Sequence, residues 1–297
     1  MERLNKGVWQ AVGAYTIWGL LPLYWKALHD VPALQLISHR IVWSSLLLTV
    51  MLIALRQLPA FRATAFAPRT VSVYAVAAVL LGVNWLTYVW AVNAGFVVET
   101  SLGYFINPLL SVLLGVVFFS EKLRPAQWAS VALAAAGVAY LTYDYGRLPW
   151  IALVLASTFA VYGIVKKTAP LPSVDGLALE TGILFLPALA VLVFAELNGT
   201  GGFGGASPLM VLAFAGTGVV TTVPLLLFSA SAKRIPLVWI GILQYIAPTL
   251  QFLLGVFVFR EEVSAHTLVG FGLVWAALVL FGAEAIARRV AEPVTAE

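Results

Sequence analysis

Residues 101–141 read SLGYFINPLLSVLLGVVFFSEKLRPAQWASVALAAAGVAYL, and residues 242–281 read ILQYIAPTLQFLLGVFVFREEVSAHTLVGFGLVWAALVLF. A shift of 140 residues aligns the two stretches at four informative positions, namely Pro108 with Pro248, Gly115 with Gly255, Phe119 with Phe259, and Glu121 with Glu261. A proline inside an apolar helix removes a backbone hydrogen bond and kinks or breaks the helix. The alignment therefore predicts an internal duplication in which each copy contains one interrupted apolar helix.

The composition indicates that lipid surrounds most of the chain. The sequence is 62% hydrophobic and 10% charged, whereas a soluble domain carries about 25% charged residues. It contains no cysteine, and its three histidines lie far apart, so we expect no disulfide, metal site or cofactor. The net charge of +4 includes no basic run longer than two residues, so we expect a lipid bilayer and no nucleic acid as partner.

Ten apolar ranges are long enough to cross a bilayer as helices. They fall at roughly 7–25, 33–56, 71–92, 97–119, 126–143, 149–166, 177–196, 208–231, 237–259 and 265–287. We interpret the first range as a retained span because it is too long for the apolar region of a signal peptide. The predicted fold class is an all-α integral membrane protein with ten transmembrane helices, five in residues 1–145 and five in residues 146–297.

The distribution of Lys and Arg predicts the orientation, because cytoplasmic loops carry an excess of these residues. With the N-terminus inside, thirteen fall on the cytoplasmic side, and the four on the outer side are Lys26, Arg40, Arg147 and Arg260. Both termini are therefore expected in the cytoplasm. Because each repeat has an odd number of spans, the second must cross in the opposite sense, which is the inverted-repeat arrangement typical of secondary transporters.

Small and polar residues form one helical stripe in each of the two proline-containing ranges. The first stripe contains Ser101, Tyr104, Pro108, Ser111 and Gly115, and the second contains Gly241, Gln244, Pro248, Gln251 and Gly255. Such faces belong against protein or water rather than lipid. The hypothesis is that both stripes line one central cavity, and the alternative is close helix packing through small residues.

Aromatic and polar pairs on other spans admit the same two interpretations. Tyr15 and Trp18 share a face of the first range, Asn84 and Tyr88 share one of the third, and Tyr162 lies on the sixth. Aromatic residues near span ends usually form interfacial belts, but these lie in mid-span, so a pocket-lining role is the rival interpretation. Trp85 is expected to pack or to face lipid.

Four titratable residues near or within the spans are candidates for gating or coupling. His39 and Arg40 open the second range on the outer side, where they either snorkel to the surface or pair with Asp30, or else clamp a solute carboxylate or form an outer gate. Glu99 either caps a helix N-terminus, which favours a carboxylate, or pairs with Arg40 or accepts a proton. Glu180 lies inside the seventh range, where an acidic residue is a functional candidate, with Lys166 or Lys167 as its expected partner.

Several strings in the sequence are similar to those of one transporter family. They are His39-Arg40, GVNW at 82–85, ETSLGYFINP at 99–108, TTVP at 221–224 and QYIAPT at 244–249. The chain resembles RarD-type proteins of the EamA branch of the drug/metabolite transporter superfamily over nearly its whole length. The resemblance implies a five-plus-five inverted repeat in a bacterial inner membrane, with a solute cavity between the halves. It also implies transport of amino acids or other small metabolites, and the RarD label is associated with chloramphenicol sensitivity.

These observations predict a secondary transporter that exports amino acids or related small amphipathic metabolites by alternating access, and not an enzyme. The candidate solute-binding residues are Tyr15, Trp18, Asn84, Tyr88, Tyr104, Asn107, Ser111, Tyr162, Gln244, Tyr245 and Gln251. The candidate gating or coupling residues are His39, Arg40, Glu99, Pro108, Glu180 and Pro248. Proton coupling and facilitated movement both stay open, and the rival functions are a chloramphenicol-like drug permease and a non-transporting membrane subunit.

Overall fold

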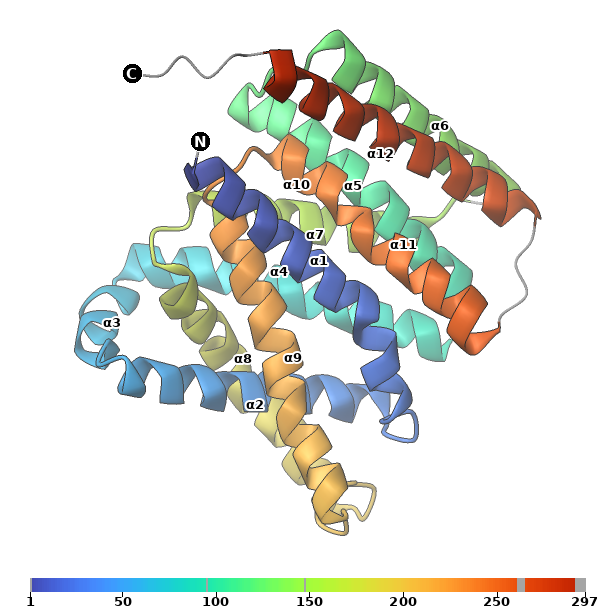
Figure 1. The fold of residues 1–297 in the computed structure, drawn as a ribbon. Helices are drawn as coiled ribbons and strands as arrows, with labels where there is room; N and C mark the ends of the chain where they lie inside the picture. Colours follow the sequence, from blue (N-terminus) through green and yellow to red (C-terminus); the bar gives the residue numbers. More distant parts are fainter. Residues whose placement is uncertain (1, 95, 147, 261–264, 292–297) are drawn as a thin grey trace.

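The computed structural model describes residues 2–94, 96–146, 148–260 and 265–291, and the regular structure within these ranges is entirely helical (Figure 1). The helices are α1 (Glu2–Lys26), α2 (Ala33–Ala54), α3 (Leu58–Ala65), α4 (Pro68–Asn93), α5 (Val97–Phe119), α6 (Pro125–Tyr145), α7 (Trp150–Thr168), α8 (Ser173–Leu197), α9 (Pro208–Ala232), α10 (Leu237–Gln244), α11 (Ile246–Leu253), the π-helix η1 (Leu254–Phe259) and α12 (Ala265–Ala291).

Eight helical stretches in the described residues are long and apolar enough to cross a membrane. They are α2, α4, α5, α7, α8, α9, the continuous run Leu237–Phe259 and α12. The two other ranges expected to span, 7–25 and 126–143, fall on α1 and α6, which have 25 and 21 residues but are not among the eight. Polar and aromatic residues lower the mean hydropathy of both helices. The chain is thus an all-α membrane protein.

The two proline-containing helices differ, which corrects the expectation that both are interrupted. α5 runs through Pro108 as one helix, whereas Leu237–Phe259 divides at Tyr245 into α10 and α11 and ends as η1. Proline removes only one backbone donor, so a well-packed helix can continue past it. Gly241 packs against this point, since a Cβ atom there would lie 2.6 Å from the Pro108 carbonyl oxygen.

The long helices pack in pairs that recur when the two halves of the chain are exchanged. The contact between α1 and α9 corresponds to that between α7 and α4. In the same way, the pair α5–α7 corresponds to α11–α1, and the pair α2–α9 corresponds to α8–α4. Three further pairs join equivalent helices of the two halves, α2 with α8, α5 with α10 and α6 with α12. α6 and α12 lie side by side at one edge of the molecule (Figure 1).

One end of the molecule gathers several basic side chains, and we refer to it as the basic end. Arg234 donates to Gln10 near the start of α1 (3.0 Å), and Arg124 pairs with Glu284 near the end of α12 (2.6 Å). The Glu121 carboxylate accepts the backbone N–H groups of Leu237 (2.8 Å) and Val238 (2.9 Å). These contacts gather the start of α1, the end of α12 and the turns after α5, α7 and α9 at this end.

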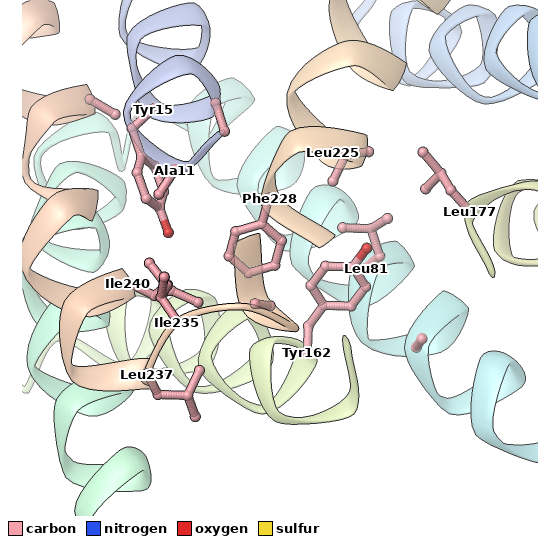
Figure 2. Close-up of a cluster of buried hydrophobic side chains, with 14 of the residues drawn as sticks. Ala11, Tyr15, Leu81, Tyr162, Leu177, Leu225, Phe228, Ile235, Leu237 and Ile240 are labelled. Atoms are coloured by element: carbon pink, nitrogen blue, oxygen red, sulfur yellow. The ribbon is translucent and has the colours of Figure 1, made fainter. Parts of the chain in front are cut away.

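A cluster of buried apolar side chains fills the centre of the molecule on the side of the basic end. Phe228 of α9 lies between Tyr15 of α1 and Tyr162 of α7 (Figure 2). Its ring centroid is 6.4 Å from that of Tyr15 and 6.0 Å from that of Tyr162, with the latter pair stacked. Three helices from both halves of the chain therefore meet in one aromatic layer.

Candidate functional site

A cavity of about 210 Å³ lies in the interior, next to this aromatic layer, and we refer to it as the central cavity. Its wall comes from eight helices of both halves: α1, α2, α4, α5, α7, α9, α10 and α11. Trp25 in the last turn of α1 and Thr100 in the first turn of α5 belong to this wall. Both belong to helix ends opposite the basic end, so the cavity is displaced toward that opposite side.

Most residues expected to bind solute line this cavity. They are Tyr15, Trp18, Asn84, Tyr88, Tyr104, Asn107, Gln244 and Gln251, joined by the gating candidates Arg40 and Pro248. Three others lie outside its wall. Tyr162 donates to Glu180 (3.0 Å), Tyr245 donates to the Phe105 carbonyl (3.1 Å), and Ser111 lies 3.5 Å from the Asn107 side-chain oxygen.

The two polar stripes serve both of the roles weighed from the sequence. Tyr104, Gln244, Pro248 and Gln251 line the cavity, whereas the glycines of the stripes allow close packing. A Cβ atom at Gly115 would lie 2.7 Å from a Glu121 carboxylate oxygen. Pro108 belongs to this packed part, because its carbonyl faces Gly241. Each stripe therefore contributes some residues to the cavity wall and others to a helix–helix interface.

Several polar atoms of the wall are already engaged, and two are not. Asn84 donates to the Leu155 carbonyl (2.8 Å) and to Thr158 (2.9 Å), and Gln251 donates to the Trp18 carbonyl (3.3 Å). The Tyr15 hydroxyl and the Gln244 side-chain oxygen are buried and have no hydrogen-bond partner among the described residues. Buried polar groups without partners cost free energy, so these two atoms are available to hold a polar group of a solute.

Arg40 of α2 is the charged side chain of the cavity wall in the described structure. Its guanidinium carbon lies 5.1 Å from the ring centroid of Trp25 and 4.5 Å from that of Trp85, and its Nε donates to Thr221 (3.0 Å). Aromatic faces attract a guanidinium. Asp30, the partner considered from the sequence, instead lies 3.1 Å from His29. Trp85 was expected to pack or face lipid; it does pack against two buried apolar clusters, and it also lines the cavity, where its ring contacts Arg40.

Two other gating candidates lie outside the cavity wall. His39 is buried and stacks on Phe214, with ring centroids 4.2 Å apart, because it points away from its neighbour Arg40 on α2. Glu99 is buried and accepts the backbone N–H of Ile151 (2.7 Å) in the first turn of α7. A helix N-terminus favours a carboxylate, so Glu99 has the capping role considered from the sequence, although it acts on α7 rather than on its own helix.

Glu180 forms a buried ion pair between the aromatic layer and the basic end. Of the two lysines expected as partners, Lys166 is the one that pairs, with its Nζ 2.6 Å from the carboxylate and with side-chain exposures of 1% and 0%. Tyr162 donates to the second carboxylate oxygen. Buried charges need such partners, and this pair adjoins the aromatic layer, because Tyr162 belongs to both.

Sequence reasoning missed part of the wall. Trp25, Phe159 and Leu225 line the cavity, but single apolar residues on apolar helices give no signal that separates cavity from lipid. Trp25 and Trp85 could have been found only by noting that Arg40, on a neighbouring span, needs an aromatic or acidic partner.

The comparisons with known proteins agree with this architecture. The model of the EamA-like transporter family matches residues 5–143. The chain is 44% identical to Protein RarD of Streptomyces exfoliatus, over 95% of this chain and 90% of that protein. It is also 44% identical to the uncharacterized transporter YojE of Bacillus subtilis (strain 168), over 93% of each chain.

A solved crystal structure shares the fold, with a TM-score of 0.68 at 22% identity, over 92% of this chain and 96% of that one. At that identity the likeness concerns the fold alone. The full-length similarity to RarD and YojE concerns the family. The chain therefore belongs to the EamA-like transporter family of the drug/metabolite transporter superfamily and is a multi-pass bacterial membrane transporter.

Proposed function

We propose that this transporter exports amino acids or related small amphipathic metabolites through the central cavity by alternating access. The observation that carries the proposal is the composition of the cavity wall, in which aromatic side chains surround a few polar groups from both halves of the chain. Solute sites are mostly apolar with a small number of orienting polar groups. Such a wall suits a solute with an apolar part and a polar part.

The proposal includes ten spans in a five-plus-five inverted repeat, with α1 and α6 as the two spans beyond the eight most apolar stretches. Its support is the packing pattern, which is preserved when residues 1–145 and 146–297 are exchanged. The cavity lies where α4 and α5 of one half meet α9, α10 and α11 of the other. Transporters built from inverted repeats bind solute at such an interface.

The proposed orientation puts the basic end in the cytoplasm and both termini with it. Arg124, Lys166, Lys167, Lys233 and Arg234 gather at this end, and cytoplasmic loops carry an excess of such residues. The cavity then lies toward the outer side, and the aromatic layer with the Lys166–Glu180 pair is the inner barrier. An inward-facing state requires α7, α8 and α9 to separate there.

Three of the six candidate residues are kept in the proposal for gating and coupling. Arg40 lines the cavity, Glu180 belongs to the inner barrier, and Pro248 follows the helix break at Tyr245. His39, Glu99 and Pro108 have packing or capping contacts instead. Proton coupling, if it operates, is proposed at Glu180, because opening the inner barrier would separate this carboxylate from Lys166.

The size of the cavity favours a metabolite over the rival, a chloramphenicol-like drug. Pockets for drug-sized ligands have about 300–1,000 Å³, and the central cavity has about 210 Å³. The unpartnered polar atoms of Tyr15 and Gln244 both belong to the cavity wall, which favours a solute-binding role over a non-transporting subunit.

Counterflow in proteoliposomes tests the proposal. Purified protein is reconstituted, the vesicles are loaded with an unlabelled amino acid or a small carboxylic acid, and uptake of the same labelled solute is followed. A carrier gives a saturable overshoot with at least one of these solutes. If no solute of either class exchanges, while a parallel reconstitution shows folded and inserted protein, the proposal is wrong.

A further inference from the structure

The described wall of the central cavity contains a positively charged side chain and no negatively charged one. Arg40 is the one side chain in the described wall that carries a full charge at neutral pH, and no Asp or Glu belongs to that wall. A guanidinium is charged throughout the physiological pH range and offers five N–H donors. Its described contacts are neutral: the Thr221 hydroxyl and the rings of Trp25 and Trp85.

The acidic side chains Glu180, Glu99 and Asp30 contact groups other than Arg40. Glu180 pairs with Lys166, Glu99 accepts the N–H of Ile151 at the start of α7, and Asp30 lies beside His29. A charge within the apolar part of a membrane protein is costly without a counter-charge. A cation whose neighbours are neutral, held at a cavity wall with unused donors, favours an anion in that cavity.

We propose, as a refinement that rests on the proposed function, that the solute carries a carboxylate bound by Arg40 and is a net anion. The two tryptophans lie against the guanidinium, whose planar fork suits the two-pronged bonding of a carboxylate. The apolar part of the solute lies against the aromatic wall. The Tyr15 hydroxyl and the Gln244 oxygen are free for an uncharged polar group of the solute.

The same wall disfavours a cation and a zwitterion. An ammonium group in the cavity would meet no carboxylate of the described wall and would be repelled by Arg40, since like charges disfavour one another at short range in a medium of low dielectric constant. Among solutes with the same apolar part, the expected order is therefore anion first, then zwitterion, with the cation last.

The test uses two series of probes that share an apolar part and differ in charge. The first contains 3-phenylpropionate, phenylalanine and phenethylamine, and the second contains 4-methylpentanoate, leucine and isopentylamine. Binding to the purified full chain is measured by isothermal titration calorimetry, and counterflow is measured for the acids and amino acids. We expect the anions to bind about tenfold more tightly than the zwitterions, because the carboxylates of both can bond Arg40, whereas only the zwitterions carry an ammonium group that Arg40 repels.

Three variants separate recognition of charge from a structural role of Arg40. Arg40→Gln should remove the preference for the anions, Arg40→Lys should keep it with weaker binding because Lys lacks the planar fork, and Arg62→Gln, at an exposed position of α3, should leave all affinities unchanged. An Arg40 that served only to hold α2 against α9 would lower the affinities of all probes equally, and this result would overturn the inference.

The outcomes also separate this inference from the proposed function. If leucine or phenylalanine exchanges and the anions show no advantage, the anion inference is wrong and the transport proposal stands. If no probe binds or exchanges, both are wrong. Unchanged anion binding by the Arg40→Gln variant would also contradict the inference, because a residue other than Arg40 would then bind the carboxylate of the solute.

Discussion

α5 and the run Leu237–Phe259 carry the same proline motif and fold differently. α5 is continuous, and the Glu121 that follows it accepts two backbone N–H groups at the start of α10. The second helix breaks at Tyr245 and ends in the π-helical turn η1, where Lys26 lies 4.6 Å from the Phe259 ring centroid. At the end of α5, Lys167 lies 5.3 Å from the equivalent Phe119 and also bonds the Ile235 carbonyl (2.7 Å).

This difference shows that a repeated sequence does not determine a repeated conformation. The neighbours of each helix decide whether a proline interrupts it, because packing against Gly241 supports α5 at Pro108. The end of α5 also belongs to the closed, basic side of the molecule, which the ion pairs hold together. We therefore expect the second helix to bend during transport, and α5 to move as a rigid body.

The largest expected effect comes from the ion pair that closes the basic end. Glu180→Gln leaves Lys166 buried without a counter-charge, and breaking such a pair costs about 3–5 kcal/mol of stability. Thermal unfolding in detergent should show a large fall in Tm. The double variant Lys166→Met with Glu180→Leu should regain most of it, because replacing both charges by apolar groups is often nearly neutral. A Tm of Glu180→Gln equal to that of the wild type would contradict the account of this end.

A smaller effect is expected from releasing the end of α5. Glu121→Gln weakens the bonds to Leu237 and Val238 and the contact with Lys167, and hydrogen bonds to charged groups are worth about 1.5–3 kcal/mol. The inner barrier should open more often, which a thiol reporter can detect, since the natural chain has no cysteine. In a Ser229→Cys background, alkylation should accelerate about tenfold or more, because each 1.4 kcal/mol changes an equilibrium tenfold.

Glu284→Gln is the matched control for this prediction, because it removes another charge at the same end, one that pairs with Arg124. It should leave the alkylation rate of the reporter near its original value. Equal acceleration by both variants would mean that the alkylation rate depends on the overall stability of the basic end and not on the contact of Glu121 with α10.

The comparison of the two prolines gives a third prediction. Pro248→Ala should restore a backbone donor next to the break and lower the turnover rate in counterflow, because the bend at Tyr245 becomes less favourable. Pro108→Ala should change turnover less, because α5 is already continuous. A larger effect at Pro108 than at Pro248 would reverse the assignment of the moving helix.

The smallest expected effect concerns a single polar atom of the cavity wall. Gln244→Leu removes the unpartnered side-chain oxygen and keeps a similar volume, so the solute should lose one hydrogen bond, worth about 0.5–1.5 kcal/mol. The half-saturation concentration for counterflow should rise several-fold with unchanged Tm. Gln35→Leu, which alters a buried amide bonded to the Thr200 carbonyl outside the cavity, is the control for loss of an amide.

Much of the architecture could be predicted from the sequence, because span length, apolar composition and helical stripes act locally. Contacts between distant segments could not. The sequence placed Glu99 near a helix start, but only the fold brings α7 to it. The packing of Trp85 was expected, but its contact with Arg40 was not, because Arg40 lies on another helix. Pro108 looked equivalent to Pro248 because the glycine that packs against it belongs to the other half of the chain.

Accessibility of the cavity from the two sides of the membrane tests the central claim most directly. Tyr104→Cys introduces the only thiol of the chain into the cavity wall, and an impermeant alkylating reagent is applied from one side at a time. We predict modification from the outer side without solute, and from the cytoplasmic side as well once an exchangeable solute is present. Modification from neither side, or a pattern that solute does not change, would contradict alternating access through this cavity.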